Sequence, residues 1–232
     1  MRQQLHFADS PSLAQKLYMT RGEYRNYEVF VTPLCHGYIC DVNFNPTMNQ
    51  IKNVIDQIIA GLEQLCAAGK IHNDLKPTNL LYRQKFVGKS VVSHFDYKYE
   101  IKVSDFGQAG KSGGTPGWTA PVFHRNRESG KEDIYSIGWV CLRLLCESKE
   151  LFRSLRDNYV HDVNASWMID FRNLIEINFV YKLVDLNSPP TVQQVKDQWK
   201  RIRSSVRMID MPRLRNIGVP RNSLQLQLKR PR

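Results

Sequence analysis

The 232-residue sequence has no hydrophobic run long enough to cross a membrane. A membrane helix needs about 20 apolar residues in succession, and the longest candidate here, residues 134–146, is interrupted by Arg143. Residues 1–10 also lack the apolar block of a signal peptide. The sequence therefore predicts an intracellular protein, cytoplasmic or nuclear, with no membrane partner.

Paired cysteines are absent as well. The five cysteines are scattered and show no C-x-x-C spacing, which argues against a disulfide framework and against a zinc site. The formal net charge is +11, and most of it comes from residues 200–232. The apolar fraction of 42% is that of a globular domain with a real core, so the basic character belongs to a tail.

Hydrophobic periodicity predicts a small β-rich start followed by a helical body. Residues 16–20 and 27–32 fit a hairpin, and residues 48–66 fit a long amphipathic helix that Gly69 ends. Later helices are indicated at residues 134–145 and 171–184, and from Thr191, which stands in capping-box spacing with Gln194. Residues 80–82 and 101–103 are interpreted as short strands, joined by an aromatic and basic surface loop at residues 86–99.

Two polar clusters flank these short strands. The first is His72-Asn73-Asp74-Leu75-Lys76-Pro77-Thr78-Asn79, and the second is Asp105-Phe106-Gly107. Transfer of a γ-phosphoryl group needs a carboxylate for the hydroxyl proton, a cation on the phosphate and oxygen ligands for magnesium. Each residue alone could be an ordinary solvated loop residue, but the ordered set has all three chemistries.

These motifs resemble the eukaryotic-type protein-kinase family, and the serine/threonine kinases in particular. The resemblance implies an α+β fold with a mainly helical C-lobe and only the final β-hairpin of the N-lobe. It divides the chain into a residual N-lobe at residues 1–34, a kinase-like C-lobe at 35–206 and a basic tail at 207–232.

The resemblance also implies roles for individual residues. Asp74 would accept the hydroxyl proton, Lys76 would neutralise the transferred group, and Thr115 would hydrogen-bond near both. Asp133 would accept backbone N–H groups of the loop that carries Asp74. The implied ligands are ATP and Mg²⁺, with the metal held by Asn79 and Asp105, and the nucleotide contacted by these two together with Thr32, Leu34, Cys35 and Leu81.

The sequence departs from the family in its first 50 residues, which contain only Gly22 and Gly37. A glycine-rich loop over the ATP phosphates and the strand lysine are therefore missing. We hypothesise that an upstream segment of a longer polypeptide, or another chain that adds strands, completes the small lobe. Asn73 replaces the arginine that binds a phosphorylated activation loop, so activation by loop phosphorylation is not expected.

The sequence supports three hypotheses about function. The first is a protein serine/threonine kinase that acts on a protein substrate, and the alternative is a catalytically silent, kinase-like interaction or regulatory module. A third interpretation takes the basic tail as a nucleic-acid or targeting element, although Lys200 to Arg203 are more simply explained as the solvated face of the last helix.

Overall fold

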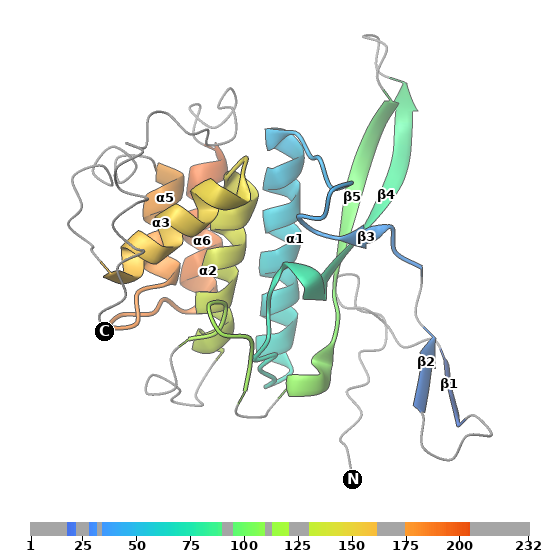
Figure 1. The fold of residues 1–232 in the computed structure, drawn as a ribbon, viewed down its shortest axis with the longest axis horizontal. Coiled ribbons are helices and arrows are strands. Elements are labelled where there is room, and N and C mark those ends of the chain that lie inside the picture. Colours follow the sequence, from blue (N-terminus) through green and yellow to red (C-terminus); the bar gives the residue numbers. More distant parts are fainter. Residues whose placement is uncertain are drawn as a thin grey trace, which may run out of the picture.

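The computed structural model of the chain describes residues 18–21, 28–31, 34–89, 95–109, 113–120, 130–161 and 175–204. Figure 1 shows helix α1 (Met48–Ala67) in the middle of the fold, with the long hairpin of β4 (Leu80–Lys89) and β5 (Phe95–Val103) on one side. The remaining helices lie on the other side of α1. The fold is α+β with a mainly helical body, as the sequence predicts.

Helix α1 begins and ends where its local sequence dictates. A capping box closes its first turn, because the Gln50 backbone N–H donates to Thr47 Oγ1 at 3.3 Å while the Thr47 N–H donates to Gln50 Oε1 at 2.7 Å. Gly69 follows the helix in the left-handed region, with φ of +63°. The predicted helix at residues 48–66 is thus confirmed to within one residue.

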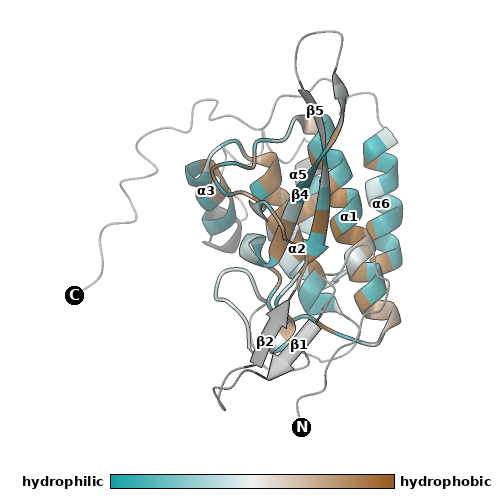
Figure 2. Cartoon of the chain, turned by 90° about the vertical axis from the view of Figure 1, so that its right-hand side faces the viewer, coloured by the Kyte–Doolittle hydropathy of each residue, from teal (hydrophilic) through white to brown (hydrophobic). Residues whose placement is uncertain are grey.

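The hydrophobic core is built around α1. Its buried apolar side chains recur at three- and four-residue spacing and comprise Ile51, Val54, Ile55, Ile58, Ile59, Leu62 and Leu65. They pack between the β4–β5 hairpin and helix α2 (Lys131–Leu145), which contacts α5 (Ile175–Leu183) in turn. Figure 2 shows hydrophobic residues on the inner sides of these helices and a hydrophilic outer side on α6. Three residues of the first polar cluster, His72, Asp74 and Asn79, are buried as well.

The hairpin corrects one prediction. Strands β4 and β5 pair antiparallel from Leu80 and Val103 out to Lys89 and Phe95, with a bulge between Phe86 and Gly88. Most of the segment interpreted as a surface loop at residues 86–99 is therefore strand. The signal was present, because apolar residues alternate with polar ones from Phe95 to Val103, the period of a half-buried strand.

The outer edge of β5 is covered by a side chain of α1. The Gln57 amide donates to the Tyr99 carbonyl at 2.9 Å, and its oxygen accepts from the Ile101 N–H at 2.8 Å. One glutamine thus satisfies two backbone groups that an edge strand would otherwise leave unpaired. This contact fixes the hairpin on α1 and so sets the position of the residues that follow β5.

The predicted N-terminal hairpin is present as β1 (Tyr18–Arg21) and β2 (Glu28–Val31), which pair antiparallel. A second sheet has the order β3-β4-β5, where β3 is the short strand Gly37–Tyr38. In the described residues β1 and β2 form a sheet of their own. Two strands alone are marginal in water.

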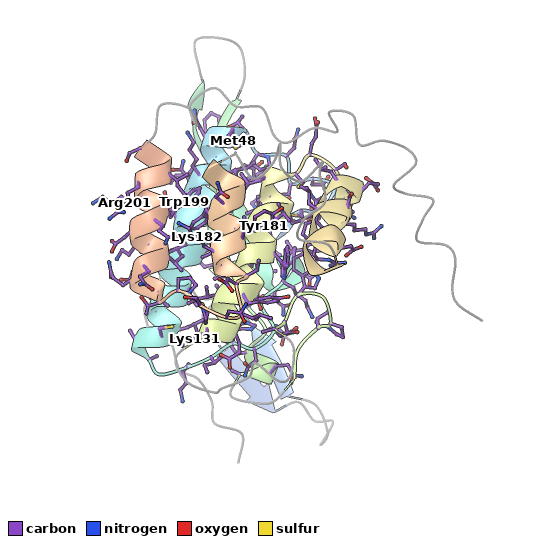
Figure 3. All side chains as sticks on the ribbon, turned by 90° about the vertical axis from the view of Figure 1, so that its left-hand side faces the viewer. Met48, Lys131, Tyr181, Lys182, Trp199 and Arg201 are labelled. Atoms are coloured by element: carbon purple, nitrogen blue, oxygen red, sulfur yellow. The ribbon has the colours of Figure 1, made fainter. Side chains whose placement is uncertain are left out.

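The described residues include two further helices. Helix α3 (Lys149–His161) was not predicted, whereas α6 (Val192–Ser204) starts at the predicted capping box of Thr191 and Gln194. Figure 3 shows Arg201 pointing outward from α6 and Trp199 pointing between α6 and α5, where its ring lies 5.4 Å from that of Phe179. The exposure of Lys200 and Arg201 fits a solvated helix face.

Helix α6 is also tied to α1 by polar contacts. Trp199 Nε1 donates to Asp56 Oδ1 at 2.8 Å, Arg203 pairs with the same carboxylate, and Lys196 Nζ lies 2.7 Å from Glu63 Oε1. Exposed ion pairs of this kind contribute little stability each. Among the helices that the structure describes, none is both long and apolar enough to span a membrane.

Candidate active site

The loop between α1 and β4 carries the first polar cluster, and Asp133 holds that loop in place. Asp133 is fully buried at the start of α2, and its two carboxylate oxygens accept the backbone N–H groups of His72 at 2.7 Å and Asn73 at 2.9 Å. This is the contact that the family resemblance implies. Burial raises the pKa of Asp133 to about 7, against the opposing effect of the two N–H bonds.

His72 connects the same loop to the end of β5. Its ring is fully buried, with Nε2 at 2.8 Å from the Ser104 carbonyl, while Nδ1 accepts the Asp74 N–H at 3.3 Å. Burial lowers the pKa of His72, so the neutral ring donates from Nε2. His72 therefore couples the position of Asp74 to that of Ser104, the residue before Asp105.

Asp74 lies at the centre of a hydrogen-bonded cluster with Lys76 and Thr115. Oδ1 accepts from the Thr115 backbone N–H at 2.8 Å and from its hydroxyl at 2.7 Å, while Lys76 Nζ lies 2.8 Å from Oδ2. Lys76 Nζ also donates to Thr115 Oγ1 at 2.6 Å. Residues 39 and 41 positions apart in the chain are thus brought together as the resemblance implied.

Asn79 is also hydrogen-bonded to Asp74. Its amide nitrogen donates to the Asp74 carbonyl at 2.8 Å and to Asp74 Oδ2 at 3.3 Å. The side-chain atom that Asn79 can still offer to a cation is its Oδ1 oxygen. The Asp74 carboxylate, by contrast, accepts four hydrogen bonds, about as many as its lone pairs allow, so a further donor binds there by displacing one of them.

The surroundings of Asp74 change its acidity in two directions. Burial alone raises the pKa of this carboxyl, but the hydrogen bonds from Lys76 and Thr115 outweigh burial and hold the pKa below its ordinary value. Asp74 is therefore ionised at neutral pH. Such a carboxylate is a weak base but a strong hydrogen-bond acceptor.

A glycine allows Thr115 to approach Asp74. Gly114 has φ of +134°, and a Cβ atom built there would lie 2.5 Å from the Asn73 carbonyl oxygen and 2.3 Å from the Thr119 methyl carbon. Any side chain at this position would push residues 113–120 away from the Asp74 loop. Gly114 is therefore a positioning residue of the site, and its place directly before Thr115 is its only signal in the sequence.

Asp105 follows β5 by two residues, beside the Asp74 loop. Its backbone is left-handed, with φ of +60°, its exposed side chain caps a short helical turn, and Oδ1 accepts the Gly107 N–H at 3.3 Å. The Ser104 N–H donates to the Asn79 carbonyl at 2.9 Å, which ties the two candidate metal ligands to one framework. Phe106 packs against His72, with ring centroids 5.1 Å apart.

The candidate nucleotide contacts are only partly described. Leu34 and Cys35 lie three and two residues before the start of β3, whose Tyr38 pairs opposite Leu81 in β4. Leu34 is 89% exposed, and Cys35 and Leu81 are half-buried. Thr32 lies outside the described residues, and its assignment stays a prediction.

The donor chemistry of the site fits magnesium. In the described part of the chain no three His, Cys, Asp or Glu side chains gather into a metal cluster. Magnesium in phosphate-transfer sites is held by one or two protein oxygens together with the substrate phosphates. One carboxylate, Asp105, and one amide oxygen, that of Asn79, supply such a set.

Comparison with known proteins agrees with this geometry. A family model described as protein kinase domain matches residues 18–208. Calcium/calmodulin-dependent protein kinase type 1 of Caenorhabditis briggsae is 35% identical over 102 residues, which cover 43% of this chain and 28% of that protein. Receptor protein kinase WSS1 of Oryza sativa subsp. japonica is 29% identical over 192 residues, which cover 78% of this chain and 20% of that protein. The chain thus spans less than a third of either relative.

Proposed function

Since the chain belongs to the protein kinase domain family, we propose that it transfers the γ-phosphoryl group of ATP to a serine or threonine hydroxyl of a protein substrate. The observation that carries the proposal is the cluster in which Asp74, Lys76 and Thr115 meet within 2.6 to 2.8 Å. A carboxylate and an ammonium group held beside each other match the needs of phosphoryl transfer.

In this proposal Asp74 orients the attacking hydroxyl and receives its proton. The hydroxyl takes the place of one hydrogen bond now made to Asp74, and the best candidate is the bond from Lys76. Lys76 Nζ is shared between Asp74 and Thr115, so it can turn toward the γ-phosphate while Thr115 keeps its own two bonds to Asp74. The ammonium group then neutralises charge on the transferred group.

Asn79 and Asp105 hold the metal in this proposal. Mg²⁺, when bound, supplies positive charge that neutralises the phosphate oxygens and orients them. We assign Leu34, Cys35 and Leu81 to the contact with the nucleotide base, and Thr32 to the back of that pocket. The domain boundaries at residues 34 and 206 and an intracellular location remain predictions.

The alternative is a kinase-like interaction module without turnover. It is favoured by the scarcity of glycine in residues 1–50, because a loop that covers the phosphates needs glycine to bring its backbone close. Loss of one preorganised electrostatic group commonly costs about 10²- to 10³-fold in rate. Adding a partner chain or an additional segment that supplies these groups distinguishes the two hypotheses. The transfer rate should rise if the chain is a slow enzyme and stay at zero if it is a silent module.

Nucleotide binding tests the proposed site directly. We expect ATP to raise the melting temperature of the chain only when Mg²⁺ is present, because the phosphates need the metal to bind beside Asp105. Asp105→Asn removes the carboxylate and should abolish the Mg²⁺-dependent part of the shift. Asp197→Asn, a substitution at an exposed residue on α6, is the matched control and should keep it. An equal shift in wild type and Asp105→Asn would contradict the assignment.

A further inference from the structure

An arginine of α3 lies against the segment that carries Thr115. The Arg156 guanidinium carbon is 5.3 Å from the centre of the Phe152 ring, and that ring stacks on Trp118 with centroids 5.4 Å apart and an interplanar angle of 16°. Such cation–π and stacking contacts fix the orientation of a long side chain. Arg156 is thereby held beside residues 113–120 rather than extended into solvent.

One nitrogen of the Arg156 guanidinium, Nη1, lies close to Gly117. Asp157 Oδ1 accepts from Nε at 3.1 Å and forms an ion pair with Nη2, which also lies 3.1 Å away. Nη1 faces the other way, and a Cβ atom built on Gly117 would lie 3.2 Å from it. No described residue accepts a hydrogen bond from Nη1. Gly117 has no side chain and is exposed, and the Arg156 side chain is itself 23% exposed.

The position of this donor relative to Asp74 matters for a bound peptide. Thr115 is bonded to Asp74, and Gly117 is two residues further along the same segment. An extended peptide advances about 3.3 Å per residue. A side chain within two residues of a hydroxyl at Asp74 can therefore reach Arg156.

We propose that Arg156 and Gly117 form a subsite for an anionic group near the phosphorylated residue of the substrate. The group is a carboxylate of Asp or Glu, or a phosphate already present on the substrate. Arginine is suited to both, because its planar donors match two oxygens at once. Asp157 contacts the guanidinium through Nε and Nη2, and its own side chain is 41% exposed. This inference rests on the proposed kinase function, since it defines the substrate class of that same site.

The test uses serine peptides that differ at one flanking position at a time. Each position within two residues of the serine carries Glu, phosphoserine or Gln, and both phosphoryl transfer and equilibrium binding by fluorescence anisotropy are measured with the 232-residue chain. We expect one position at which Glu raises kcat/KM over Gln by about tenfold, as charge-assisted hydrogen bonds do. A preference for phosphoserine over Glu would assign the subsite to phosphate.

Variants on α3 identify the residue responsible. Arg156→Gln should abolish the preference between Glu and Gln peptides, and Arg156→Lys should keep part of it. Arg153→Gln, a change at an exposed arginine three residues away on the same helix, should leave the preference unchanged. The ratio between two peptides on one variant is insensitive to partial loss of folded protein.

The outcomes separate this inference from the proposed function. Transfer to all peptides at equal rates, with equal binding, would overturn the subsite and leave the kinase activity intact. Absence of transfer together with Glu-selective binding that Arg156→Gln removes would overturn the activity and leave the subsite as a peptide-binding site. A preference that survives Arg156→Gln would also overturn the inference.

Discussion

Replacement of Asp74 by asparagine should reduce phosphoryl transfer by about 10³-fold or more, since it removes both the proton acceptor and the group that orients the hydroxyl. An amide at this position also places an NH₂ group against donors, because Lys76, Asn79 and Thr115 all donate to Asp74. We therefore expect a local loss of stability of about 1–3 kcal/mol in addition. Steady-state transfer rates and urea unfolding measure the two effects.

A matched control distinguishes chemistry from folding in this prediction. Asp56→Asn removes a carboxylate of α1 that contacts Trp199 and Arg203 of α6 and none of the residues of the Asp74 cluster. It should cost stability but leave the transfer rate per folded molecule unchanged. Equal loss of rate in the two variants would contradict the role of Asp74.

Asp133→Asn should destabilise the protein and displace the Asp74 loop. The substitution replaces one of two acceptor oxygens by a donor, so a buried N–H of His72 or Asn73 loses its partner. Leaving a buried donor unsatisfied costs about 1–3 kcal/mol. Denaturant unfolding gives the stability, and hydrogen exchange at His72 and Asn73 reports on the loop.

The pH dependence of this effect has a defined sign. Because the pKa of Asp133 is raised to about 7, the native state binds more protons than the unfolded state from about pH 4 up to 7. The stabilisation that Asp133 contributes is therefore complete below about pH 4 and is lost as the pH rises through about 7. His72 has a lowered pKa, so its contribution to stability changes with pH in the opposite direction. It is present in both wild type and Asp133→Asn and therefore does not affect the difference between them. The stability difference between wild type and Asp133→Asn should therefore narrow as the pH rises, and a constant difference would contradict the assignment.

Features with a local signal could be predicted from the sequence. Helix α1 and the start of α6 each have a capping box and three- to four-residue apolar spacing, and both were located correctly. The Asp74 cluster could also be anticipated, because its residues belong to motifs that occur in order. For the two helices one short segment contains all the information needed, whereas the contact of Thr115 with Asp74, 41 positions away, was implied by the family resemblance.

Features that depend on the tertiary fold could not be predicted in the same way. Strands β4 and β5 were placed too short, because their basic and aromatic residues have the composition of a surface loop even though they alternate. The cover that Gln57 gives to β5 and the approach of Arg156 to Gly117 join residues distant in the chain. No local pattern marks such contacts, since only the packing of helices creates them.

The most direct test of the account is transfer of labelled γ-phosphate from ATP by this chain to matched peptides that differ only in Ser, Thr or Tyr. The account predicts phosphoserine and phosphothreonine as products, a dependence on Mg²⁺, and loss of both products in Asp74→Asn. Binding of ATP without transfer to any peptide would contradict it and would favour a kinase-like interaction module.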